Sequence, residues 1–360
     1  MEMIKSDHIN VNIIFMIQIL LVVTLIGLFI YVCINEFNLY EDFITIEPNI
    51  ETIFVSIASY RDDECNSTIS NLYQNADIPK RIFVGACQQN KLLLETCFGN
   101  NSKDESLIQN VRLISIPFNE AKGPTYARYL CSTLYRNETY FMQIDSHTQF
   151  EKGWDSHFIT MMNELKSQGI KKPILSQYPV DVTKRDEHKK YIGVLCDSKF
   201  NDNGMITFLS VLKENKDNKY FPTPFTAGGF LFMQGSALYE VPFDPLLPYL
   251  FEGEEILYSA RLWTSGYDIY TPNITLLYHH YIRKEKPHFW EDIKDWYIEQ
   301  KNAHTKVKYL LGMSSEKPPE YLMKDIEKYG MGKERSLEDY WNYAGINIQE
   351  KKSESSKKFC

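Results

Sequence analysis

Tyr140-Phe141-Met142-Gln143-Ile144 is an apolar run that leads directly into Asp145-Ser146-His147. A short run of this kind predicts a strand that is buried on both faces of a sheet. A carboxylate and an imidazole two residues apart can both point into the crevice beyond the end of such a strand. We interpret the motif as the edge of an α/β domain at which a ligand binds. The alternative is a loop Asp and His that only cap the next helix.

Similar runs occur on both sides of this motif. Apolar, β-branched stretches predict strands at residues 52–58, 81–86, 111–116, 172–176 and 274–278, and helices are expected at 65–74 and 127–135. Strands that alternate with helices predict a mostly parallel central sheet flanked by helices. The fold class is therefore α/β, and the polar residues that follow the first strand, Ser59-Tyr60-Arg61, should lie at the same edge as Asp145.

The N-terminal region predicts a membrane anchor. No charged residue occurs between Ile9 and Asn35, and the stretch is long enough to cross a bilayer as a helix. We divide the chain into a short N-terminal segment (1–11), a transmembrane anchor (12–35), a stem (36–50), a large α/β domain (51–349) and a disordered tail (350–360). The positive-inside rule favours a cytoplasmic N-terminus, and therefore a single-pass type II protein with its domain in the lumen of the ER or Golgi.

Composition narrows the function classes. The net charge of −8 argues against nucleic acid as a partner, because such binding requires a basic face. The seven cysteines include no C-x-x-C pair and have wide spacings, so we expect buried thiols and neither a zinc site nor a disulfide framework. Four N-x-S/T sequons, at Asn66, Asn100, Asn137 and Asn273, permit a lumenal location.

Several further residues could act with the Asp145-Ser146-His147 motif. Asp145 and His147 offer an oxygen and a nitrogen ligand, which suits Mn²⁺ and also Mg²⁺ or Zn²⁺. Gly228-Gly229 would let backbone approach a ligand closely. Glu254-Glu255 could form a carboxylate pair, and His279-His280 with Arg283 could supply a third metal ligand and a cation for phosphate. Each also has a structural reading, as a turn, a helix start or a strand end.

The order of these pieces resembles a known family. Asp145-Ser146-His147, Ala227-Gly228-Gly229-Phe230, Phe251-x-Gly253-Glu254-Glu255 and Tyr278-His279-x-x-x-Arg283 follow one another as in the family of the Skp1-type hydroxyproline N-acetylglucosaminyltransferases. The pattern is more distantly similar to the polypeptide GalNAc-transferases. Further matching pieces include Gly123-Pro124-Thr125-Tyr126-Ala127-Arg128, and the resemblance extends from about Thr52 to about Gly345.

This resemblance implies a GT-A nucleotide-sugar-binding fold and a UDP-sugar donor, with UDP-GlcNAc preferred. Asp145, His147 and His279, with His280 as the alternative to His279, would hold Mn²⁺ or Mg²⁺ against the diphosphate. By the same analogy, Ser59, Tyr60 and Arg61 would border the uridine, Arg128 would approach the donor, and Gly228, Gly229 and Glu254 would line the sugar. Arg283 would face phosphate. The acceptor would be a hydroxyl of a protein, including hydroxyproline, or of a glycan.

The mechanism stays open at this level. The resemblance suggests retention of anomeric configuration, in which Glu254 or Glu255 would orient the acceptor or stabilise positive charge, whereas an inverting enzyme needs one carboxylate as a base. The Skp1-modifying enzymes are cytosolic, so an anchored chain favours a lumenal acceptor. The competing functions are a transferase of another UDP-hexose, a membrane-tethered sugar-binding protein without activity, and a metal-dependent phosphohydrolase.

Overall fold

The computed structural model describes residues 24–29, 31, 50–91, 96–97, 109–188, 190–282 and 286–360. The chain divides into two units, Met1–Ile50 and Glu51–Cys360. In the first unit the described residues 24–29 and 31 are helical, while the rest of the expected anchor (12–35) and all of residues 36–49 lie outside the described part. Among the described residues, no helix combines the length and the apolar character that crossing a bilayer requires.

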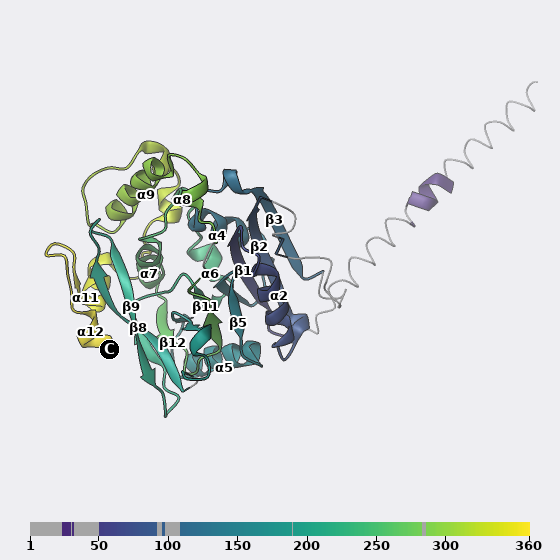
Figure 1. Cartoon of the computed structure of the whole chain (residues 1–360), viewed down its shortest axis with the longest axis horizontal. Coiled ribbons are helices and arrows are strands. Elements are labelled where there is room, and N and C mark those ends of the chain that lie inside the picture. The colour runs from purple at the N-terminus through teal and green to yellow at the C-terminus, as the bar shows by residue number, and fades with distance from the viewer. Residues whose placement is uncertain are drawn as a thin grey trace, which may run out of the picture. The chain divides into compact units, whose positions relative to one another are not determined.

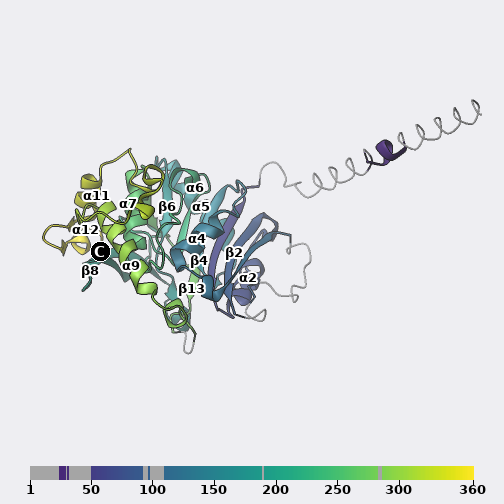
Figure 2. The ribbon, with the colours of Figure 1, turned by 90° about the horizontal axis from the view of Figure 1, so that it is seen from above.

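The second unit is built on an eight-stranded sheet (Figure 1). In spatial order its strands are β10 (Phe221–Thr223), β12 (Asp268–Thr271), β6 (Pro173–Ser176), β11 (Phe230–Gln234), β4 (Tyr140–Asp145), β1 (Ile53–Tyr60), β2 (Ile82–Asn90) and β3 (Val111–Pro117). Figure 2 shows β6, β4 and β2 following one another across the domain. The α/β class is confirmed. The sheet is mixed, because β11 runs antiparallel to both β6 and β4, and β10 runs antiparallel to β12.

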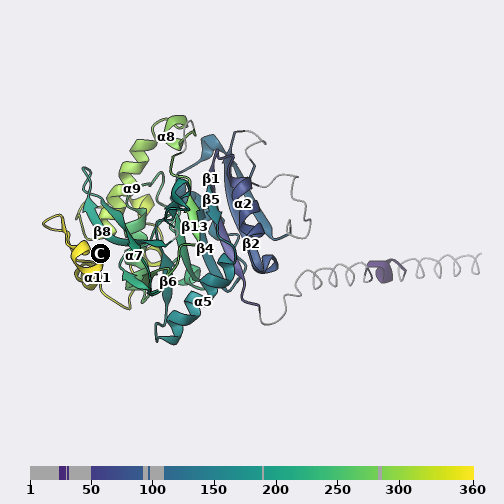
Figure 3. The same ribbon diagram turned by 60° about the horizontal axis from the view of Figure 1, so that its bottom comes forward.

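Both faces of this sheet are covered by helices, as the apolar runs predicted. Alternate residues of β1 point to opposite faces. Ile53, Val55 and Ile57 join a core with α2 (Cys65–Gln74) and α5 (Trp154–Ser167). Phe54 packs on the other face, in a cluster that includes residues of α6 (Ala237–Glu240) and α7 (Glu254–Thr264). Figure 3 shows α5 beneath β6.

One helix begins earlier than the sequence predicted. Helix α4 spans Pro124–Ser132, whereas we expected 127–135. Gly123 precedes it with a φ of 86°, in a region that glycine adopts without a steric penalty. Pro124 stands at the first helical turn, where its missing N–H costs nothing and its fixed φ favours the helix. The expected range was based on the apolar pattern alone, which does not include the Gly123-Pro124 signal for the start of the helix.

Smaller elements complete the domain. A three-stranded sheet contains β5 (Thr148–Phe150), β13 (Leu277–His279) and β7 (Val180–Asp181). The hairpin β8 (Tyr191–Phe200) and β9 (Ile206–Glu214) lies near α11 (Leu337–Ala344) and α12 (Ser355–Phe359), away from α2 (Figures 1 and 3). The remaining α-helices are α8 (Phe289–Asp292), α9 (Trp296–Leu310) and α10 (Ile326–Tyr329).

The expectation of a disordered tail is wrong. Residues 350–360 contain β15 (Lys352–Ser353), which pairs with β14 (Ile346–Asn347), and then helix α12. Phe359 packs with Ile192 and Val194 of β8, and Cys360 is bonded to Cys196. The polar composition of the tail did not indicate the packing of Phe359 or the disulfide of Cys360. These two interactions together offset the entropy that is lost when the tail is ordered.

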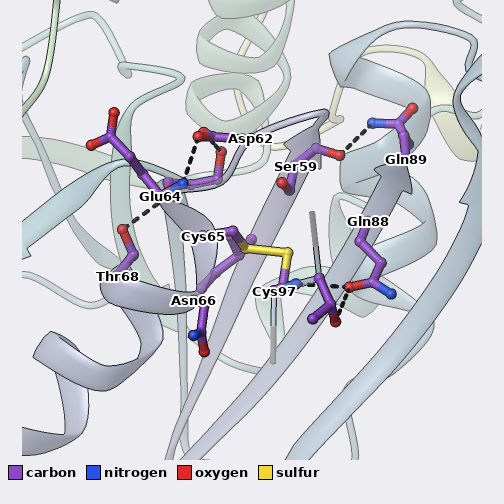
Figure 4. Close-up of a disulfide and its surroundings, with 12 residues drawn as sticks. Ser59, Asp62, Glu64, Cys65, Asn66, Thr68, Gln88, Gln89 and Cys97 are labelled. Carbon is purple, nitrogen blue, oxygen red and sulfur yellow. Dashed lines mark hydrogen bonds between the residues drawn. A yellow bond between two sulfur atoms is a disulfide. The ribbon is translucent and has the colours of Figure 1, made fainter. Parts of the chain in front are cut away.

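The expectation of buried thiols holds for only part of the cysteines. Cys87 and Cys131 are buried free thiols. Cys65 is bonded to Cys97, and Figure 4 shows this bridge between the start of α2 and the chain that follows β2. The wide spacings of the cysteines gave no indication of these two disulfides. Their pairing depends on tertiary contacts between cysteines 32 and 164 residues apart. Cys33 lies outside the described residues.

Candidate active site

The carboxyl ends of β1 and β4 meet at one edge of the sheet. The two strands are parallel, and Asp145 at the end of β4 lies opposite Ala58. The chain then turns into β5, which pairs with β13 so that Thr148 lies opposite His279. This second pairing brings His279 back to the motif at the end of β4. The side chains of Asp145, His147 and His279 place one ligand atom each within 4.8 Å of one another.

Asp145 is held by basic side chains on two sides. The Nε2 atom of His279 lies 3.1 Å from Asp145 Oδ2, and Arg128 Nη2 lies 3.4 Å from Oδ1. Burial alone raises the pKa of the Asp145 carboxyl. The hydrogen bond with His279 and the charges of His279, Arg128 and His147 outweigh this effect and hold the pKa well below its usual range. Asp145 is therefore a carboxylate at neutral pH.

The two neighbouring histidines take different places. The ring of His279 packs against that of His147, with 4.5 Å between the centroids, and its Nδ1 is buried with no hydrogen-bond partner among the described residues. His280 instead lies against Gln149 and Glu64, at 3.1 and 3.4 Å. On a strand, successive side chains point to opposite sides. The geometry thus selects His279 over its alternative, His280, as the partner of Asp145 and His147.

Arg128 connects this cluster to the start of α7. Its guanidinium forms an ion pair with Glu254 and also donates to the Gly228 carbonyl at 3.1 Å. The other oxygen of Glu254 accepts a hydrogen bond from the Thr125 hydroxyl at 2.9 Å. Both Glu254 oxygens therefore have protein donors, and the carboxylate orients Arg128 toward Asp145.

Glu255 is also fully engaged. One of its oxygens accepts the Gly228 N–H at 2.7 Å, and the other accepts the Tyr178 hydroxyl at 2.6 Å. Burial raises the pKa of the Glu255 carboxyl, and these hydrogen bonds together with the Arg128 charge offset the rise only in part. The carboxylate fixes the backbone of the Gly228-Gly229 segment.

The paired glycines sit where no side chain fits. A Cβ atom at Gly228 would stand 2.8 Å from Glu254 Oε1 and 3.1 Å from Arg128 Nη2. At Gly229 it would stand 3.1 Å from Asp145 Oδ2. The prediction of close backbone approach is therefore supported by the packing of both glycines against the charged groups of the cluster.

The Ser59-Tyr60-Arg61 segment lies at the same edge, as predicted, and is held by a residue that the sequence did not single out. The Tyr60 hydroxyl donates to Asp292 Oδ2 at 2.8 Å, and Arg61 Nη1 pairs with the same oxygen at 2.7 Å. Ser59 is fully buried. Asp292 closes α8, and nothing in its local sequence indicated a partner 231 residues away. Arg283 lies outside the described residues.

A cavity of about 150 Å³ adjoins the cluster. One wall carries Tyr60, Gln89, Ser146 and His147, and another carries aromatic residues of the segment around α8. The rings of His288 and Trp290 are stacked 4.4 Å apart, and Phe251 packs edge-on to Trp290. These residues were missed at the sequence level. Their density between positions 281 and 297 is the signal that could have indicated them.

The family of the chain is shown by a family-model match that covers all residues of the site. The family model described as glycosyltransferase (GlcNAc) matches residues 52–107 and 95–350. The chain belongs to this glycosyltransferase family. The match includes every motif residue discussed above, so the enzyme class and the resemblance to GlcNAc-transferases are confirmed. No curated protein sequence matches the chain.

Solved structures resemble this family member at low sequence identity. A crystal structure of GalNAc-T7 with UDP, GalNAc and Mn²⁺ has a TM-score of 0.51 and 12% identity, over 83% of this chain and 58% of that one. This chain therefore spans little more than half of GalNAc-T7, and the likeness shows the GT-A fold. S. aureus TarS 1-349 in complex with UDP-GlcNAc scores 0.39 at 11% identity, over 82% and 93% of the two chains. The mannosyltransferase PcManGT from Pyrobaculum calidifontis, with GDP-Man and Mn²⁺, scores 0.42 at 11% identity, over 78% and 69%.

Proposed function

We propose that this glycosyltransferase moves GlcNAc from UDP-GlcNAc to a hydroxyl of a protein, including hydroxyproline, or of a glycan. The observation that carries the proposal is the convergence of Asp145, His147 and His279 beside a cavity at the carboxyl end of the sheet. The family description supports GlcNAc as the sugar. The Mn²⁺ and UDP bound by GalNAc-T7 support the metal and the nucleotide.

The residues fit a divalent cation. Two imidazoles and one carboxylate form a mixed nitrogen and oxygen set, which suits Mn²⁺ and allows Mg²⁺. The Asp145 side chain is 30% exposed, so a cation can reach its carboxylate from solvent. The His279 Nε2 atom lies 3.1 Å from Asp145 Oδ2, so this ring offers the nitrogen that faces the carboxylate. Such an ion neutralises the charge that develops on the UDP leaving group.

The chain's own groups would bind and orient the donor. Tyr60 and Gln89 line the cavity, and the buried Gln89 Oε1 has no hydrogen-bond partner among the described residues. An amide oxygen in this position can accept the N3–H of uracil, and Trp290 and Phe251 offer faces for the base. Arg61 does not line the cavity; it positions the wall through Asp292.

Both Glu254 and Glu255 act in this proposal as positioning residues. All four of their carboxylate oxygens accept hydrogen bonds from protein groups. A general base must reach the proton that it removes from the acceptor. Because each oxygen already accepts a hydrogen bond from the protein, we give the two carboxylates a positioning role, as a retaining mechanism would use them.

The compartment proposed is the lumen of the ER or Golgi, with the chain held by the anchor at residues 12–35. Two disulfides support this proposal, because disulfides persist in secretory compartments and are rare in the cytosol. A lumenal enzyme would meet secretory proteins and glycans as acceptors.

The test is UDP release by the full chain in mild detergent, without acceptor, from UDP-GlcNAc, UDP-GalNAc and UDP-glucose, with Mn²⁺ or with EDTA. We expect metal-dependent release that is fastest with UDP-GlcNAc. Asp145→Asn should reduce it by about 100-fold or more, because the anionic ligand that holds the metal against the leaving group is lost, while the thermal midpoint stays unchanged. Faster release from another donor would replace GlcNAc. No release from folded wild-type protein would favour a sugar-binding role.

A further inference from the structure

Asp62 directly follows Ser59-Tyr60-Arg61 in the sequence and has been assigned no role at the site so far. It is fully buried, and it follows β1 immediately after Arg61, whose φ is 44°. Its Oδ2 atom lies 2.8 Å from His147 Nδ1 and 2.6 Å from Ser146 Oγ. Its Oδ1 accepts the backbone N–H of Glu64 at 3.0 Å, a contact visible in Figure 4. One carboxyl group therefore holds both residues that follow Asp145.

These contacts determine which face of His147 is available. A carboxylate only accepts hydrogen bonds, so the Nδ1 atom of His147 carries the proton that it donates to Asp62. When the ring is neutral, this hydrogen bond leaves the lone pair on Nε2, where a metal can bind it. A histidine that donates its second ring N–H to a carboxylate is oriented and made more basic as a metal ligand.

The backbone of residues 146–148, beside Asp62, is also held by hydrogen bonds. Thr68 on α2 donates its hydroxyl to the Ser146 carbonyl at 2.9 Å and accepts the Thr148 N–H at 3.1 Å. The Cys65–Cys97 disulfide ties the start of the same helix to the chain beyond β2. Asp62 therefore holds the side chains of Ser146 and His147, while Thr68 holds the backbone of the same turn.

We propose that Asp62 is a positioning residue that fixes the tautomer and the direction of His147 for a divalent cation. The proposal rests on the metal site of the proposed function. It also explains Ser146, the middle residue of the motif, whose hydroxyl donates to the same carboxylate oxygen. The neighbouring acidic residues do not share this role, because Asp63 pairs with Lys286 and Glu64 with His280.

The first test is Mn²⁺ binding by the full chain, followed by the electron spin resonance signal of free Mn²⁺ with UDP present. Asp62→Asn should weaken binding by about 10–100-fold, as is typical when such an outer partner of a ligand is lost. Asp63→Asn is the matched control and should bind like the wild type, because its side chain is exposed and lies outside the cluster. An Asp62→Asn chain that binds as tightly as the wild type would overturn the proposal.

Activity separates positioning from a merely structural role. In Asp62→Asn, the Mn²⁺ concentration that gives half-maximal UDP release should rise by the same 10–100-fold, and excess Mn²⁺ should restore most of the maximal rate. A maximal rate that excess Mn²⁺ does not restore would contradict the proposal. If the wild type and Asp62→Asn bind Mn²⁺ equally tightly, only the role proposed for Asp62 is contradicted. If the wild type binds no Mn²⁺, the metal site of the proposed function is contradicted.

A second measurement does not depend on whether the variant folds. In wild-type chain labelled with ¹⁵N-histidine and free of metal, long-range ¹H–¹⁵N spectra report the tautomer of each ring. His147, assigned by comparison with His147→Asn, should be protonated on Nδ1 and not on Nε2. The opposite tautomer would overturn the proposal even if metal binding were unaffected.

Discussion

The backbone of Gly228 makes three hydrogen bonds to the side chains of the site. Its N–H donates to Glu255, and its carbonyl accepts from Arg128 and from Gln143. The backbone of one residue thus links α4, β4 and α7. Because glycine has no side chain, the charged groups can close around it.

We predict that Gly228→Ala impairs activity without unfolding the chain. The added methyl would meet Glu254 Oε1 at 2.8 Å and displace the Glu254–Arg128 pair, whose side chains can move aside. A misplacement of about 1 Å in a catalytic cluster typically lowers the rate by about 100-fold. UDP release and the thermal midpoint measure the two effects. Gly27→Ala, where an added Cβ meets nothing within 4 Å, is the matched control and should change neither. Unchanged release in Gly228→Ala would contradict the close packing.

At the scale of elements, helix α9 is fastened to the domain by a buried ion pair. Lys306 Nζ lies 2.6 Å from Asp244 Oδ2, and both side chains are completely buried. Burial lowers the pKa of the Lys306 ammonium, although the charge of Asp244 and its hydrogen bond act against this. The pair fixes α9 beside the residues that follow α6.

Removing one member of this pair should cost more than removing both charges. We expect Lys306→Met to lower the free energy of unfolding by about 3–5 kcal/mol, because Asp244 would remain charged and unpaired. The double variant Lys306→Met/Asp244→Asn should recover a large part of this loss, since the amide can still accept the Leu246 N–H. Urea unfolding of the three chains measures the difference. A double variant as unstable as Lys306→Met alone would show that the stranded charge is not the cause.

The tail is a second element whose attachment can be tested. The Cys196–Cys360 bridge closes a loop of 164 residues. In the chain-entropy model such a bridge stabilises the fold by about 5 kcal/mol, and measured losses are about 2–5 kcal/mol. Cys360→Ser should therefore lower the free energy of unfolding by about 2–5 kcal/mol. Lys357→Ala on the same helix, an exposed site, should change it by less than about 0.5 kcal/mol. Equal stability of both variants would mean that the bridge does not constrain the unfolded chain.

At the scale of the whole molecule, the proposed lumenal location makes Asn137 the sequon to examine. Asn137 is exposed, and its φ is 68°. Its side-chain oxygen accepts a hydrogen bond from the hydroxyl of Tyr239, a residue that is itself 65% exposed. Asn66 and Asn273 are half-buried. In the sequon that begins at Asn273, the Thr275 hydroxyl donates a hydrogen bond to the Tyr191 carbonyl. Asn100 lies outside the described residues.

We predict that the full chain, translated in the presence of microsomes, carries an N-linked glycan at Asn137. Glycosidase treatment should reduce its apparent mass, and Asn137→Gln should remove this shift, because the Asn137 side chain is exposed in the fold. Asn66→Gln is the matched control and should keep the glycan at Asn137. A chain without any glycan would contradict the lumenal orientation. A glycan on other sequons but not on Asn137 would contradict the exposure argument alone.

Local sequence determined the parts of this protein that depend on neighbouring residues. The alternation of apolar runs with helical segments predicted the α/β class, and the polar residues after 52–58 and 140–144 predicted the edge at which the site forms. Those residues follow strands, and strand ends in a parallel pair share an edge by geometry. The Asp145-Ser146-His147 motif could be found because strand end and ligands are adjacent in the chain.

Only the tertiary structure decided the contacts between distant segments. The choice of His279 over His280 depends on the pairing of β13 with β5, which brings His279 to Asp145, 134 residues away in the chain. The engagement of Glu254 and Glu255, the hold of Asp292 on Tyr60 and Arg61, the disulfides and the ordered tail have the same origin. A local pattern gives the type of a residue and the face on which it lies, but not the partner that packing brings to it. The role of Asp62 belongs to this second group, since its partner His147 lies 85 residues further along the chain.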